Sequence, residues 1–109
     1  MTTAVGVGTP FTLAEWEVRP GDEAAFIEAW DRFAEWTAEH QPGAIVGALL
    51  QDATNSRRFV SYGPWERPEQ IAPWRATPEF QESFARFREL CTAITPHTMT
   101  CVAIRGPSA

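Results

Sequence analysis

Four side chains have the types that acid–base and hydrogen-bond chemistry needs: Glu15, His97, Ser61 and Trp65. A carboxylate in a mostly apolar strand, or an imidazole near neutral pH, is suited to take a proton from a substrate. A serine hydroxyl and an indole N–H donate hydrogen bonds, and such donors stabilise negative charge that develops during a reaction. The four residues therefore predict a catalytic group with Glu15 or His97 as the base and Ser61 and Trp65 as donors.

Each base candidate also has a structural interpretation. Glu15 and Glu17 lie on one face of the same predicted strand, where a carboxylate needs a partner or a cavity. The available cations are Arg57, Arg58 and Arg105. For Glu15, the roles of general base and of ion-pair partner both stay open. For Glu17, the role of ion-pair partner is favoured. His97 follows a proline and is also typical of a solvated strand end, while Ser61 lacks the histidine and acid spacing of a nucleophilic triad.

Aromatic residues are frequent, with five tryptophans and seven phenylalanines in 109 residues. Large aromatics at the ends of strands and helices often form the rim of a cavity as well as a core. Trp65 ends a strand-like run and Trp74 lies in the next helical segment, so the pair is predicted to wall a flat ligand, with core packing as the alternative. The other predicted pocket residues, from helical stripes that serve core and cavity alike, are Trp30, Phe33, Phe80 and Phe84.

Apolar periodicity predicts the elements that position these residues. Two long amphipathic helices are expected at residues 23–39 and 78–93, and the apolar stripe of the second includes Cys91 and Ile94. Thr77 is a suitable cap for this second helix. A short helix is expected at residues 68–74. The predicted strands are residues 11–18, 44–51, 57–65 and 98–104, the middle two joined as a hairpin.

The element order βαββαβ predicts an α+β, ferredoxin-like fold with an antiparallel four-stranded sheet. Both long helices would cover one face of this sheet. The other face still carries apolar side chains such as Val60 and Tyr62, and a partner sheet is their simplest cover. The sequence therefore predicts a homodimer joined through sheet faces. The domain is expected at residues 11–105, after a flexible arm at 1–10 and before a tail at 106–109.

Composition argues against several classes of function. The net charge is −5 and the nine basic residues, all arginine, form no run beyond Arg57 and Arg58, so nucleic-acid binding is not expected. No apolar run approaches the roughly 20 residues that a membrane-spanning helix needs, and the N-terminus lacks the pattern of a signal peptide. The sequence therefore predicts a cytoplasmic protein that does not enter a membrane. Two cysteines and two histidines at no ligand spacing, with no phosphate loop, predict no metal, flavin or haem. Cys91 and Cys101 are expected to be reduced, with a disulfide as the alternative.

Three stretches resemble the antibiotic biosynthesis monooxygenase family. They are residues 18–26, 41–44 and 58–66 (Arg-Phe-Val-Ser-Tyr-Gly-Pro-Trp-Glu), the last followed by Trp74 and by Pro78-Glu-Phe80. The resemblance spans residues 11–105 and implies a dimeric α+β barrel that binds a small aromatic substrate. Similar chains include cofactor-free oxygenases of phenolic polyketides, quinol oxygenases and haem-degrading enzymes.

The resemblance is closer for architecture than for any one reaction. Family oxygenases that act on anthrones are similar at Trp65, but they have an asparagine where this chain has Ser61. They also use a tyrosine and an arginine on the following helices, at positions that align with Ile71 and close to Phe84. Haem-degrading relatives use an asparagine on the first strand and a histidine on the second helical region, and this sequence has neither there.

Together these features give one leading hypothesis and two alternatives. The leading one is a cofactor-independent monooxygenase that uses dioxygen to oxidise a flat phenolic or quinol-like, polyketide-type molecule in a dry aromatic pocket. In this reaction a phenolate reduces dioxygen and a peroxide collapses to a quinone. The alternatives are a non-oxygenating cyclase, lyase or isomerase with the same acid–base groups, and a non-catalytic dimer that binds a small ligand.

Overall fold

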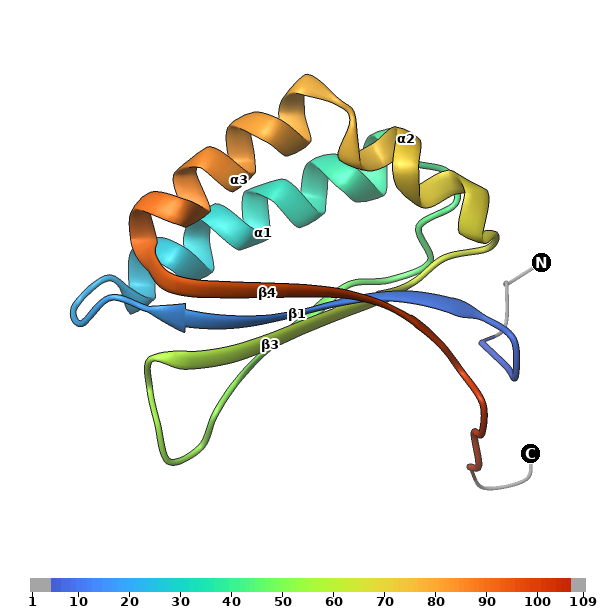
Figure 1. Cartoon of the computed structure of the whole chain (residues 1–109), viewed down its shortest axis with the longest axis horizontal. Coiled ribbons are helices and arrows are strands. Elements are labelled where there is room, and N and C mark those ends of the chain that lie inside the picture. Colours follow the sequence, from blue (N-terminus) through green and yellow to red (C-terminus); the bar gives the residue numbers. More distant parts are fainter. Residues whose placement is uncertain (1–4, 107–109) are drawn as a thin grey trace.

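The computed structural model describes residues 5–106, which form a four-stranded sheet with helices on one face (Figure 1). The elements are β1 (Pro10–Val18), α1 (Glu23–His40), β2 (Ala48–Gln51), β3 (Arg58–Pro64), a 3-10 turn (Pro68–Gln70), α2 (Ile71–Arg75), α3 (Pro78–Leu90) and β4 (Cys91–Thr100). The sheet is antiparallel in the order β2-β3-β1-β4. This topology confirms the predicted α+β ferredoxin-like fold. No helix within this range is long and apolar enough to cross a bilayer.

The register of the central strand β1 determines which side chains face the helices. Ala14 pairs with Ser61 of β3 and with Pro96 of β4. Directly paired residues on adjacent strands share one face of a sheet, and successive residues alternate between faces. The helix side of β1 therefore carries the even-numbered residues, and Glu15 lies on the side away from the helices.

Aromatic rings form the centre of the core on the helix side. Phe26, Phe59 and Phe87 are almost fully buried, and Trp16 is 3% exposed. The ring centroids of Trp16 lie 5.1 Å from those of both Phe26 and Phe87. Such tilted and edge-on pairs suit the ring quadrupoles and add to the burial of apolar area. This cluster holds α1 and α3 against the middle of the sheet.

The predicted start of α3 is confirmed in its local chemistry. Thr77 precedes the helix, and its Oγ1 accepts a hydrogen bond from the Phe80 backbone N–H at 3.1 Å. Pro78 occupies the first helical position, where a missing N–H has no cost. Phe80 is thereby fixed one turn into the helix, on the side that faces the sheet.

The predicted last strand was wrong in its bounds. β4 covers Cys91–Thr100 instead of residues 98–104, and α3 ends at Leu90 instead of residue 93. Cys91 and Ile94 therefore belong to β4, where Ile94 pairs with Trp16, and His97 lies inside the strand instead of opening it. The helical spacing of Cys91 and Ile94 was misleading. This threonine-rich segment pairs with β1 as a strand, because long-range backbone pairing overrides the local apolar periodicity.

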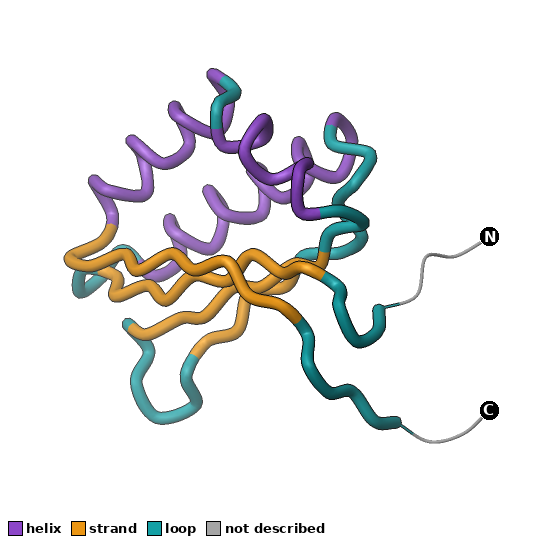
Figure 2. The backbone as a smooth tube through the Cα atoms, turned by 45° about the vertical axis from the view of Figure 1, so that its right-hand side comes forward, coloured by secondary structure: helices purple, strands orange, loops and turns teal. Residues whose placement is uncertain are grey.

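The start of the predicted second strand also differs. β2 begins at Ala48, not at residue 44, although Ala44 still forms an isolated bridge with Trp65. Residues 1–4 of the expected arm and 107–109 of the expected tail lie outside the described residues. Within the described part, Gly8 donates its N–H to the Cys101 carbonyl at 2.8 Å, so the chain before β1 runs beside the end of β4. The segment after Thr100 then leaves the sheet (Figure 2).

Both cysteines are free thiols, as expected, but their surroundings differ. Cys91 is buried at the junction of α3 and β4, and Cys101 is half-buried. Burial raises the pKa of the Cys91 thiol from 9.0 to about 11, against a smaller opposing effect of Arg19. Because the folded pKa is the higher one, this effect favours the folded state below pH 9.0 and is lost as the pH rises towards about 11.

We expect a thiol reagent at about pH 8 to modify Cys101 rapidly and Cys91 only after denaturation, since the thiolate is the reactive form. Ellman's reagent, followed by absorbance in native and denatured samples, measures this difference. The matched control is Cys101→Ser, which should abolish the rapid phase. Two equally rapid thiols in the native protein would contradict the buried position of Cys91.

Candidate active site: an aromatic cavity between sheet and helices

A cavity of about 130 Å³ lies between the helix side of the sheet and the helices α1, α2 and α3. The structure brings the aromatic residues predicted for a pocket into one wall, together with Trp16. These residues are Trp30, Phe33, Trp65, Trp74, Phe80 and Phe84. The sheet contributes the floor through small side chains, among them Ala14 and Gly63. The role of these residues in binding stays a prediction.

The aromatic walls present flat surfaces at close spacing. Trp65 and Trp74 have ring centroids 4.9 Å apart, and Phe33 stacks on Trp74 at 5.6 Å. Phe80 and Phe84 stack at 4.2 Å. Because these rings pack against one another, their planes are held in place before any ligand binds. The cavity is therefore shaped for a planar apolar body.

Three indole N–H groups around the cavity each donate to a hydroxyl that also lines it. The pairs are Trp16 with Ser61 at 3.0 Å, Trp65 with Thr12 at 3.1 Å and Trp74 with Thr37 at 3.1 Å. A hydroxyl that accepts one hydrogen bond still has its own proton to donate. No hydrogen bond between described residues uses the protons of these three hydroxyls. The cavity thus offers hydroxyl donors, whereas the indole N–H of Trp65 is already engaged by Thr12.

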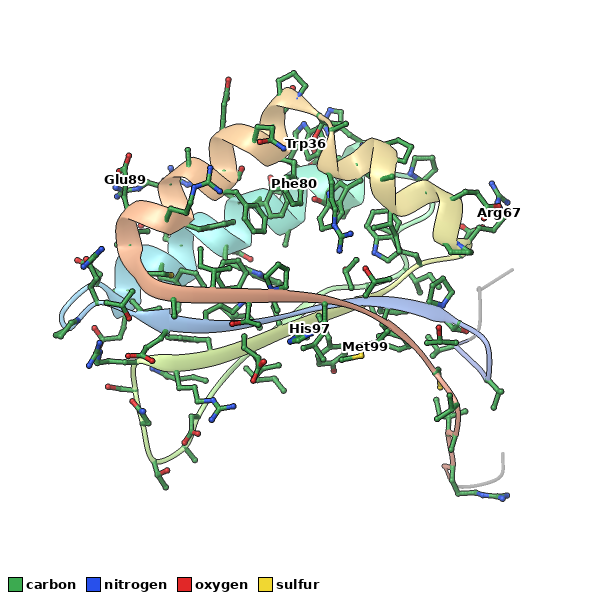
Figure 3. All side chains as sticks on the ribbon, viewed as in Figure 1. Trp36, Arg67, Phe80, Glu89, His97 and Met99 are labelled. Atoms are coloured by element: carbon green, nitrogen blue, oxygen red, sulfur yellow. The ribbon has the colours of Figure 1, made fainter. Side chains whose placement is uncertain are left out.

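Glu15 and His97 lie on the opposite face of the sheet from this cavity. Glu15 Oε2 is 3.1 Å from His97 Nε2, and Glu15 Oε1 is 3.3 Å from Arg58 Nη2. His97 and Met99 lie on the side away from the helices (Figure 3). The ion-pair interpretation of Glu15 is thus observed with Arg58, and Arg57 reaches Glu17 at 3.5 Å.

The structure therefore does not bring the predicted base and the predicted donors together. The strand alternation could have shown this from the sequence, because Glu15 has the opposite parity to the apolar residues Ala14, Trp16 and Val18. No carboxylate or imidazole occurs among the described residues that line the cavity. A catalytic role for Glu15 or His97 stays a prediction, which the geometry of a single chain does not support.

Sequence reasoning missed Thr12, Thr37 and Arg75 as cavity residues. The two threonines accept the indole N–H groups described above. Arg75 ends α2 directly after Trp74, and it is the one charged side chain among the described residues that line the cavity. Arg75 is the one arginine directly next to a tryptophan in the sequence, but this neighbour alone does not predict that its side chain lines a cavity.

The site shows no metal-binding cluster. Between residues 5 and 106, no three or more histidine, cysteine, aspartate or glutamate side chains gather as a metal site would need. The polar groups of the cavity are hydroxyls and one guanidinium, and neither is a preferred ligand of a transition metal. The lining of the cavity can therefore offer a ligand hydrogen bonds, one positive charge and apolar surface.

Comparison with known proteins shows the family to which the chain belongs. Residues 11–98 match the family described as antibiotic biosynthesis monooxygenase. The match covers most of the chain, and the chain belongs to this family. Curated proteins gave no match.

Solved structures with the same fold are distant in sequence. SnoaB, a cofactor-independent oxygenase from Streptomyces nogalater, superimposes with a TM-score of 0.80 at 22% identity, over 89% of this chain and 96% of that chain. A conserved protein from Methanosarcina mazei Go1 gives a TM-score of 0.79 at 16% identity, over 87% and 94% of the two chains. At these identities the similarity shows the fold alone.

We expect Ser61→Ala to destabilise the protein by about 1–3 kcal/mol, because it leaves the buried Trp16 N–H without an acceptor. Chemical denaturation followed by tryptophan fluorescence measures the change. Ser83→Ala on α3 is the control, since Ser83 is half-buried and accepts no indole N–H from a described residue. This control should change stability by less than about 0.5 kcal/mol. Equal effects of the two substitutions would contradict a structural role of the Trp16–Ser61 pair.

Proposed function

We propose that the chain is a cofactor-independent monooxygenase that oxidises a small flat phenol or quinol-like molecule in the aromatic cavity. The observation that carries the proposal is a cavity walled by stacked indole and phenyl rings, in which three hydroxyls have an unused proton. Family membership supports it independently. The fold shared with SnoaB, described as a cofactor-independent oxygenase, is consistent with it.

The volume of the cavity limits what it holds. An engineered protein cavity of about 150 Å³ binds benzene. At about 130 Å³, this cavity suits one substituted aromatic ring, and a fused-ring substrate needs side chains at the wall to move. We therefore expect single-ring phenols, or one ring of a larger polyketide-type molecule, to be the part that enters.

The reaction is balanced without a cofactor. A phenol with a free para carbon loses its O–H proton, and the phenolate transfers one electron to dioxygen. The resulting radicals combine at the para carbon, and the peroxide loses water. The balance is one phenol and one dioxygen giving one para-quinone and one water, with the C–H carbon oxidised to a carbonyl. In this scheme the hydroxyl of Ser61, which accepts the Trp16 N–H, donates a hydrogen bond to the anionic oxygen of the substrate.

The lining of the cavity also bears on proton removal. Because it holds no carboxylate or imidazole among the described residues, the proposal favours substrates acidic enough to enter as phenolates. The aromatic walls exclude water and so strengthen the hydrogen bonds to that anion. A cyclase, lyase or isomerase would need a side-chain acid and base in the cavity, whereas a substrate that enters as a phenolate has already lost the proton that precedes electron transfer to dioxygen. The oxygenase is therefore the better-supported candidate.

Oxygen consumption tests the proposal directly. With a panel of single-ring and fused-ring phenols and quinols, we expect uptake of one dioxygen per quinone formed and no release of hydrogen peroxide. With ¹⁸O-labelled dioxygen, one labelled atom should enter the product, as mass spectrometry measures. Peroxide formed in equal amount to quinone would indicate a simple oxidase, and no uptake with any compound would leave a ligand-binding protein.

Filling the cavity gives the matched pair of variants for this assay. Ala34 of α1 lines the cavity, whereas Ala85 of α3 is exposed. We expect Ala34→Leu to lower oxygen uptake at least ~10-fold, because the added branch takes the space of the ring and displaces it. Ala85→Leu should keep the rate of the unmodified protein. Equal rates in both variants would place the reaction outside this cavity.

We further propose that the sheet face away from the helices is covered by a second copy of the chain. This face carries exposed apolar side chains from three strands, namely Leu50 at 54%, Tyr62 at 37% and Met99 at 44% exposure. Exposed apolar side chains gathered on one face are typical of an interface. The half-buried Glu15 and His97 pair lies among them, so their charges would meet those of the partner.

We expect a dimeric mass by light scattering at micromolar concentration. Leu50→Asp should shift the protein towards the monomer, because a carboxylate is costly to bury in an apolar interface. The matched control is Ile27→Asp, which changes an exposed apolar residue on α1 and should leave the dimer intact. A monomeric unmodified protein, or equal dissociation of both variants, would contradict the proposed interface.

A further inference from the structure

Arg75 places a positive charge at the edge of an otherwise apolar and hydroxyl-lined cavity. The residue is half-buried at the end of α2. Its Nη2 donates to Thr98 Oγ1 on β4 at 3.1 Å, so the guanidinium spans the space between the helix layer and the sheet. A guanidinium has five N–H donors, and this bond uses one. Four donors are therefore left for other partners.

No carboxylate partner accounts for these donors. Five other arginines form ion pairs with glutamates, namely Arg32, Arg57, Arg58, Arg67 and Arg86. Within the described part of the chain, no carboxylate oxygen lies within 4.0 Å of the remaining four guanidinium groups. Of these, Arg19, Arg88 and Arg105 are exposed, and only Arg75 is half-buried. A partly buried cation without a counter-charge is costly, and the usual partner is an anion. In this position the missing anion would come from a ligand.

Two threonine hydroxyls on the sheet lie near Arg75. Thr98 pairs with Thr12 across β1 and β4, and both face the helices. Thr12 lines the cavity and holds the Trp65 indole N–H. The guanidinium, two hydroxyls and an indole therefore meet at one end, while the stacked rings of Phe80 and Phe84 wall the rest. This division suits a ligand with an aromatic body and an anionic group at one end.

We infer that Arg75 is the anion anchor of the cavity and that the natural ligand is a hydroxylated aromatic carboxylic acid. The fork of the guanidinium matches the two oxygens of a carboxylate and holds them through paired hydrogen bonds. A phenolate has one oxygen and would use one arm of that fork. This inference rests on the proposed function, because it names the substrate class of the same cavity.

A purely structural role for Arg75 would predict a different behaviour. The bond to Thr98 connects α2 to β4, and a neutral amide could provide a similar link without burying a charge. If the link were the whole role, replacement of Arg75 would alter stability and would affect charged and neutral ligands equally. An anchor for a carboxylate instead discriminates between an acid and its ester.

The test compares the binding of 3-hydroxybenzoate, a single-ring phenol with a free para carbon, and of its methyl ester by calorimetry and tryptophan quenching. The two probes share the ring and the phenol and differ in the carboxylate. We expect the unmodified protein to bind the acid ~10-fold or more tightly than the ester, as a charge-assisted hydrogen bond gives. Arg75→Gln should remove this preference and leave the affinity for the ester within about threefold. Arg75→Lys should keep part of the preference, because it retains the charge without the fork.

Arg88→Gln is the matched control. Arg88 is exposed on α3, does not line the cavity and forms no ion pair with a described residue, so its replacement should leave both affinities unchanged. Thermal unfolding of each variant shows whether the fold is kept. Equal binding of acid and ester by the unmodified protein would overturn the inference. So would equal weakening of both probes in Arg75→Gln.

The same probes separate this inference from the proposed function. If phenols consume oxygen equally with and without a carboxylate, and independently of Arg75, the monooxygenase proposal stands and the anchor is wrong. If Arg75-dependent binding of the acid is found but no phenolic acid consumes oxygen, the anchor stands and the monooxygenase proposal is wrong.

Discussion

The cavity depends on one recurring interaction, in which a buried indole N–H donates to a neighbouring hydroxyl. An indole buried without an acceptor loses the hydrogen bond that it makes in water, at a cost of about 1–3 kcal/mol. Trp16, Trp65 and Trp74 avoid this cost by pairing with residues that also line the cavity. The same pairing fixes the large rings in place and orients the hydroxyls. Shape and polarity of the cavity thus have a common origin.

The central strand separates two functions because its side chains alternate. The even-numbered residues of β1 contribute to the cavity floor. The odd-numbered ones lie on the opposite face, where Glu15 contacts His97 and Arg58. Because the backbone of the sheet lies between its two faces, the side chains on them form separate chemical environments. Within a single chain the charged group therefore lies apart from the cavity, on the face that we propose a partner sheet covers.

Membership of the antibiotic biosynthesis monooxygenase family and the chemistry of this cavity bear on different questions. The family accounts for the sheet, the helices and the position of Trp65 at the end of β3. The polar groups that line the cavity are a separate matter, because Ser61 stands where the resembling anthrone oxygenases have an asparagine and the resemblance assigned no role to Arg75. A hydroxyl stabilises an anion by a single hydrogen bond, whereas a guanidinium adds charge and a second arm. The relative strength of the Ser61 and Arg75 interactions would determine whether the cavity favours a phenolate or a carboxylate.

The sequence by itself determined the architecture, because the 3.6-residue stripes of α1 and α3, the Thr77 cap and the hairpin between β2 and β3 are all local signals. It also indicated the aromatic residues of the wall, since these lie on the same stripes. Only the tertiary structure decided that residues 91–97 are strand, because their pairing with β1 links positions about 80 residues apart in the chain. Only the tertiary structure placed Arg75 beside Thr98 and separated Glu15 from Ser61. Each of those relations depends on which faces of distant elements meet, and no local pattern carries that information.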